Sequence, residues 1–313
     1  MKKMIAACLI ATIISIGLTT MAADESKTPT TEKPKIQTTE KPKTEATEKV
    51  TASLKQFEAE AQNILTRENV HSMLDRPRLL KEYGVTYQPE LVVSDDLASK
   101  LSHCNLRIYA GIKMYDAIYA AVFNKGQEVA KSIQAIEEVM QKLDLRSHAD
   151  FSGHMLGTVR KAASETENIN VKEMLDQLTT DALNELPVFM SSSESSHYLM
   201  DAIYGFTVEA IYVMGYFHQT DQNDSLMKLR MQQPTFMAWI NAVDRVLAAF
   251  EKAKKDLHIE CQPPISLDIM KDVTKLAEAE RSGKITTKEG RIQLAVIRER
   301  LAKIRASVLA DAK

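Results

Sequence analysis

From residue 51 onward, apolar residues recur at steps of three and four, the spacing of one face of an α-helix. No segment shows the sustained alternation that is typical of a strand. The pattern predicts an all-α fold, a multi-helix bundle of about eight or nine helices. The clearest predicted helices cover residues 54–65, 94–123, 127–143, 151–164, 170–186, 193–218, 234–257, 266–281 and 287–312.

Several boundaries of these helices follow from local signals. Residues 75–93 contain proline and glycine and are predicted to form a loop or hinge. Ser94 precedes two acids, as an N-cap does at a helix start. Asn170, with Glu173 three residues later, resembles a capping box. Pro187 is expected to end the helix that begins there.

Two of the predicted helices, over residues 106–123 and 198–217, carry very few charges. A helix that is apolar nearly all round is either central in a large core or spans a membrane. The acids and tyrosines within these two segments, and their amphipathic neighbours, favour two central helices of a packed bundle.

The last predicted helix has an apolar seam at steps of three and four, flanked by charged residues: Leu294, Ile297, Leu301, Ile304 and Val308. Such a seam is typical of a coiled coil and would suit a dimer. Packing of this face on the chain's own bundle is the favoured interpretation.

The N-terminus has the three-part layout of a secretory signal peptide. Lys2 and Lys3 precede an apolar stretch over residues 4–18, and small residues near Ala22 offer cleavage sites. The stretch is shorter than the ~20 apolar residues of a comfortable membrane span. We therefore expect residues 1–23 to be cleaved and the chain to be exported to the periplasm or the cell exterior. An uncleaved anchor is the alternative.

Residues 24–50 form a spacer rich in Thr, Lys, Pro and Glu, with a near-repeat at residues 31–35 and 39–43. It contains no aromatic residue and balances lysines with acids, so it is expected to be disordered. After cleavage it would be a free tail, either passive or in weak contact with envelope polymers. Residues 51–313 are then a single all-α domain.

Net charge and cysteine content bear on the class of partner and on the compartment. Removing two lysines with the leader changes the formal net charge from −2 to about −4, which gives no basic field for nucleic acid. The remaining cysteines, Cys104 and Cys261, would form one disulfide in an oxidising compartment. Two separate buried thiols are the alternative.

One constellation could hold a metal. Glu194, His197 and Asp201 recur at i, i+3 and i+7 and so project from one helix face. Carboxylates and imidazole suit zinc or iron, and Glu-x-x-His is half of a di-iron bundle motif. A second Glu-x-x-His occurs at Glu68 and His71, but so short a pattern also arises by chance.

Three acids lie inside the apolar helices, next to tyrosines: Asp116, Asp201 and Glu209. Buried acids with a raised pKa are common at functional sites. The favoured interpretation is structural, with each acid bound to a tyrosine hydroxyl or to a lysine such as Lys113.

The chain contains no nucleophile elbow, no Walker-type loop, no Cys-x-x-Cys and no haem-attachment motif. This favours a non-catalytic helical binding or scaffold domain of the cell envelope, with an envelope protein or polymer as partner. The alternative is a metal- or small-ligand-binding bundle built on Glu194, His197 and Asp201.

Overall fold

The computed structural model describes residues 66–144, 149–164, 170–189, 193–220, 241–245 and 267–310, together with the isolated positions 52, 55, 59, 62 and 248. All of these belong to the second of two units, Lys43–Lys313, the first being Met1–Pro42. Within the described residues every regular element is a helix, which confirms the all-α fold class. The predicted signal peptide and the spacer lie outside these residues.

The elements follow one another as α3 (Arg67–Leu74), α4 (Arg76–Glu82), the 3-10 helices η1 (Pro89–Leu91) and η2 (Asp95–Leu97), α5 (His103–Val122), α6 (Gly126–Lys142), α7 (Ala149–Ser164), α8 (Val171–Phe189), α9 (Ser193–Thr220), α12 (Leu267–Arg281) and α13 (Thr287–Ala310). Of the predicted helix over residues 234–257, the positions that are described are helical.

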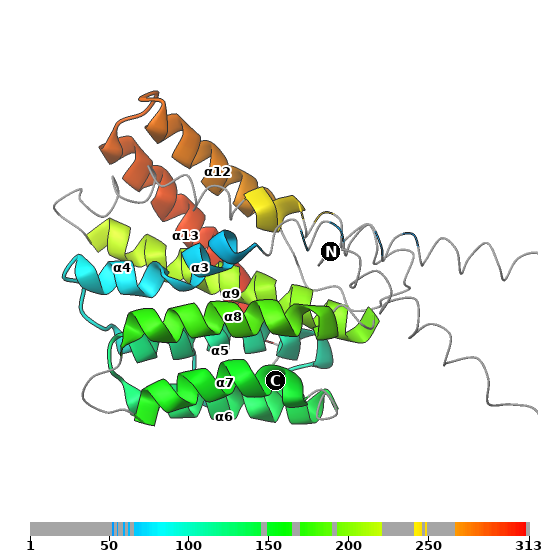
Figure 1. The fold of residues 1–313 in the computed structure, drawn as a ribbon. Coiled ribbons are helices and arrows are strands. Elements are labelled where there is room, and N and C mark those ends of the chain that lie inside the picture. Colours follow the sequence, from blue (N-terminus) through cyan, green and yellow to red (C-terminus); the bar gives the residue numbers. More distant parts are fainter. Residues whose placement is uncertain are drawn as a thin grey trace, which may run out of the picture. The chain divides into compact units, whose positions relative to one another are not determined.

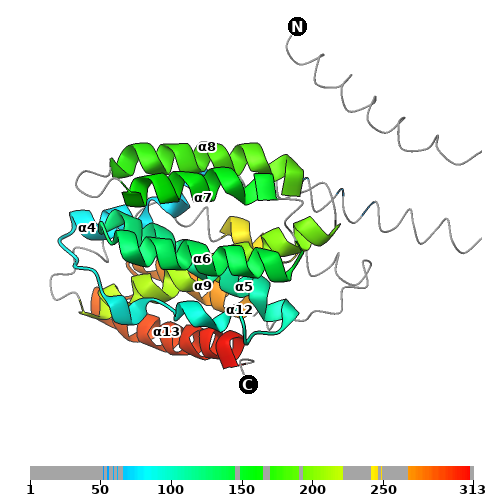
Figure 2. The same cartoon turned by 90° about the horizontal axis from the view of Figure 1, so that it is seen from below.

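Helix α5 lies between α6 on one side and α9 on the other (Figures 1 and 2). Helices α6, α7 and α8 pack one on the next, and α3 lies against α8. The hairpin of α12 and α13 packs through α13 on α9, on the side away from α7. Three helices thus separate α5 from α9 in sequence, although the two are neighbours in space.

The segment before α5 differs from the prediction. Ser94 precedes only the short η2, and α5 begins at His103 rather than at residue 94. The predicted loop over residues 75–93 contains α4, with Pro77 in its first turn. A backbone N–H in the first turn has no partner within the helix, so proline loses no hydrogen bond there. Helix α8 continues past Pro187 to Phe189, so proline did not end it.

Other helix boundaries agree with the prediction. Glu173 N donates to Asn170 Oδ1 at 3.3 Å, and Asn170 Nδ2 donates to Glu173 Oε2 at 3.2 Å, so the capping box forms. Asn124 follows α5 in a left-handed conformation, with φ 57°, and so ends that helix close to the predicted end at residue 123.

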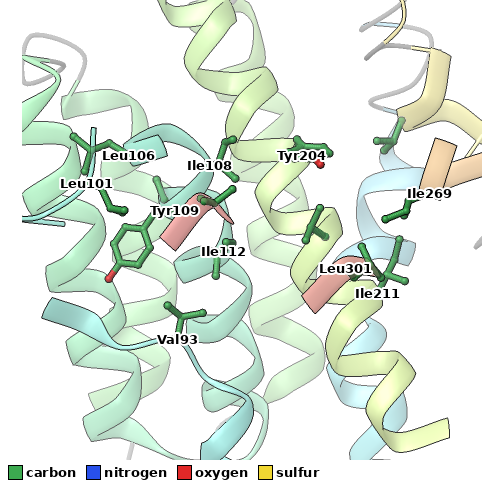
Figure 3. Close-up of a cluster of buried hydrophobic side chains, with 14 of the residues drawn as sticks. Val93, Leu101, Leu106, Ile108, Tyr109, Ile112, Tyr204, Ile211, Ile269 and Leu301 are labelled. Carbon is green, nitrogen blue, oxygen red and sulfur yellow. The ribbon is translucent and has the colours of Figure 1, made fainter. Parts of the chain in front are cut away.

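Apolar side chains from α5, α9, α12 and α13 meet in one core cluster (Figure 3). Ile211 of α9 and Leu301 of α13 both belong to this cluster. Most of the seam predicted for the last helix is buried in this cluster, namely Leu294, Ile297, Leu301 and Val308, which favours packing on the chain's own bundle. Among the described residues, no helix combines the length and hydropathy that crossing a membrane requires.

Candidate functional site

Arg107, His197 and Asp201 form a buried polar group between α5 and α9. Arg107 Nη1 lies 3.0 Å from His197 Nδ1, and His197 Nε2 lies 3.1 Å from Asp201 Oδ2. The same Nη1 lies 3.4 Å from His197 Nε2, so the guanidinium is close to both ring nitrogens. Arg107 Nη1 is 3.8 Å from Asp201 Oδ2, and the Asp201 side chain is 0 % exposed.

Two of the three predicted metal ligands are thus neighbours, but a guanidinium accompanies them. The side chain of Glu194 is not among those that the structure describes. In the described part of the chain, no group of three or more His, Cys, Asp or Glu residues is placed to hold a metal ion. The zinc or iron site of Glu194, His197 and Asp201 stays a hypothesis.

A second buried polar group lies one to two turns further along α5. Lys113 Nζ donates to the carbonyl of Val93 at 2.8 Å and to Asp116 Oδ2 at 3.1 Å, and it pairs with Asp95 Oδ1 at 2.5 Å. The first two contacts are hydrogen bonds and the third is an ion pair. Asp116 Oδ2 also accepts from the amide of Val93 at 3.1 Å. The segment before α5 is held against α5 by these bonds, which explains why it does not continue that helix.

Glu209 of α9 is held by Arg305 of α13 in a two-pronged pair. Arg305 Nε donates to Glu209 Oε2 at 2.7 Å and Arg305 Nη2 donates to Glu209 Oε1 at 2.8 Å. Arg305 Nη2 also donates to the carbonyl of Leu91. The guanidinium lies over the ring of Tyr212, 4.6 Å from its centroid. One arginine therefore joins α13, α9 and the segment before α5.

The two buried acids of this region influence each other. Burial and the nearby Asp116 carboxyl raise the pKa of Glu209 to about 8, although Arg305 opposes the shift. Burial likewise raises the pKa of Asp116, against the lowering influence of Lys113 and Arg305. Asp116 and Glu209 thus belong to one coupled network, and Asp201 belongs to the other buried group.

The predicted burial of these acids is observed, and their partners agree with the prediction only in part. Asp116 pairs with Lys113, as predicted. Glu209 pairs with an arginine about a hundred residues later in the chain, and Asp201 lies against a histidine and an arginine. Sequence reasoning missed Arg107 and Arg305, because charged partners on different helices leave no periodic signal.

His71 of the second Glu-x-x-His faces a neighbouring helix, whereas Glu68 is exposed. His71 Nδ1 lies 3.6 Å from Asp176 Oδ1 and 3.4 Å from Thr179 Oγ1, both on α8. Beside it, an open groove of about 420 Å³ is lined by Arg67 of α3 and by polar residues of α8 and the residue before it. Its charges are mixed and exposed, so it selects no ligand class.

Cys104, at the start of α5, is disulfide-bonded. The other two cysteines, Cys8 and Cys261, lie outside the described residues. The specific pairing of Cys104 with Cys261 stays a prediction.

Comparison of the chain with protein-family models, curated proteins and solved structures found no match.

Proposed function

We propose that this chain is an exported, non-catalytic helical domain that binds or holds an envelope protein or polymer. The main support for the non-catalytic role is that the acidic groups of the central helices are buried in the core and paired there. Asp116, Asp201 and Glu209 are buried and each lies against a basic side chain. A substrate would have to separate α5, α9 and α13 to reach them. In this view α5 and α9 are the two central apolar helices of a bundle of about eight or nine.

Export is supported by two independent features. The leader over residues 1–23 has the layout of a cleavable signal. The disulfide at Cys104 is a bond that persists in oxidising compartments. Fusing residues 1–50 to a reporter enzyme that is active only outside the cytoplasm tests this. An active fusion with a mature N-terminus near residue 23 is expected, and an inactive fusion would overturn export.

The non-catalytic role is tested by removing the buried charges without opening the core. Replacing Glu209 with Leu and Arg305 with Met together exchanges an ion pair for apolar groups of similar size, which is often tolerated. In source cells from which the gene has been deleted, this folded variant is expected to correct the growth or envelope defect of the deletion as well as the parent does. Failure to correct it, with normal melting, would indicate chemistry at the network.

A metal- or small-ligand-binding bundle is the second candidate. Among the described residues, neither oxygen of the buried Asp201 carboxylate has a hydrogen bond of good geometry, and His197 is adjacent. Zinc or iron would use these two groups and Glu194. Elemental analysis of the dialysed protein, with melting curves before and after chelation, tests it. Stoichiometric metal that is lost in the H197Q variant, with a lower melting temperature, would replace the first proposal.

A further inference from the structure

The outer face of α13 carries the two most exposed large apolar side chains of the described residues. Ile292 is 61 % exposed and Val296 is 55 % exposed, one turn apart. The third exposed one, Tyr83, is 41 % exposed and lies at the end of α4. The opposite face of α13 is already buried in the chain's own core. Contiguous exposed apolar surface is a candidate interaction site, whereas single scattered apolar residues are ordinary.

Charged residues on the same face show which partner would fit. Glu289 and Lys303 stand seven residues before and seven residues after Val296, so both lie close to the line of Val296 on the helix. Both are exposed. The amide and hydroxyl of Thr286 bind Glu289 and lower its pKa, which keeps the carboxylate charged.

This symmetric placement makes the face complementary to itself in one orientation. When two copies of α13 run antiparallel and cross at Val296, Glu289 of each copy meets Lys303 of the other. A parallel pair would instead set Glu289 against Glu289 and Lys303 against Lys303. Contacts of this kind, in which one patch binds its own copy, are typical of twofold dimers.

We propose that the outer face of α13 binds a second copy of this chain, with the two helices antiparallel about Val296. The proposal deepens the binding or scaffold role and rests on it, since it names the partner. One helix pair buries less than the roughly 1,000 Å² of a stable interface. The dimer is therefore weak and forms as protein concentration rises.

Sedimentation velocity of the full mature chain over a wide concentration range tests the proposal. The parent is expected to shift from monomer to dimer. V296E sets two carboxylates against each other at the centre and is expected to stay monomeric throughout. Q134E adds the same charge at an exposed position of α6 and is expected to dimerise as the parent does.

The antiparallel register has its own test at Lys303, which is exposed and meets Glu289 of the other copy in this arrangement. K303E sets two carboxylates against each other and is expected to weaken the dimer several-fold more than K303Q does, with the gap narrowing in high salt. Equal effects of the two variants would overturn the antiparallel register.

A parent that stays monomeric at every concentration, or a dimer that V296E does not disturb, would overturn self-association through α13. Neither result bears on the proposed function, which fails separately if the folded variant lacking the Glu209–Arg305 pair does not correct the defect of the deletion.

Discussion

Gly111 of α5 lies directly against the backbone of Ala202 in α9. A Cβ atom built on Gly111 would be 1.9 Å from the carbonyl oxygen of Ala202. The contact is reciprocal, because a Cβ on Gly205 would be 2.0 Å from the carbonyl oxygen of Ile108. Since backbone atoms cannot move aside as side-chain ends can, these two glycines set the separation of the two helices.

Replacing Gly111 with Ala is therefore expected to destabilise the protein strongly. The added methyl group forces α5 and α9 apart, and overpacking of this kind costs about 3 kcal/mol or more where backbone must shift. Denaturant unfolding of G111A measures it. The matched control is G157A, because a Cβ at Gly157 meets no atom within 4 Å. That variant is expected to gain about 0.5–1 kcal/mol from the better helix former. Similar losses for both variants would contradict the close crossing.

The close crossing illustrates what the sequence can and cannot reveal. Apolar periodicity predicted α5 and α9 well, since both helices bury most of their surface. Glycine inside a helix was visible as well, but which helix would approach it depends on tertiary packing. The prediction of where α5 begins was wrong for a related reason, because Lys113 of α5 binds Asp95 and Val93 of the preceding segment.

Breaking the pair of Glu209 and Arg305 from one side is expected to cost far more than removing both partners. R305M leaves the buried Glu209 carboxyl group without its partner, at about 3–5 kcal/mol. A similar loss of unfolding free energy is expected for E209L, which leaves Arg305 without its partner. The double variant should lose much less than the sum, since both charges leave the core together. Unfolding free energies of the four proteins give the coupling directly. Additive losses would show that the two side chains act independently.

Two buried pairs show why the candidate site was only partly predictable from the sequence. His197 and Asp201 stand four residues apart on one helix, so their proximity followed from helical geometry. Arg305 reaches Glu209 from α13, 96 residues later in the chain. A local sequence pattern cannot predict a contact between residues so far apart in the chain.

Glu185 of α8 is expected to make stability depend on pH. Burial raises its pKa to about 7, Asp181 adds to the shift, and the backbone amides of Met155 and His154 oppose it. Between about pH 4.5 and pH 7 the folded state binds more protons than the unfolded state, so this group's contribution to stability falls as pH rises. E185Q cannot titrate and is expected to flatten the fall in melting temperature over that range. Parallel pH profiles for parent and E185Q would rule out a raised pKa at Glu185.

Cys104 is expected to pair with Cys261. Cys104 is disulfide-bonded, and once the leader with Cys8 is cleaved, Cys261 is the only other cysteine in the chain. A bond across such a long stretch restricts the unfolded chain and is expected to contribute about 2–5 kcal/mol. C104S, C261S and the double variant should lose the same amount, because each removes one and the same bond. Peptide mapping of the non-reduced mature protein should yield one linked pair, and a free thiol at Cys261 would disprove the pairing.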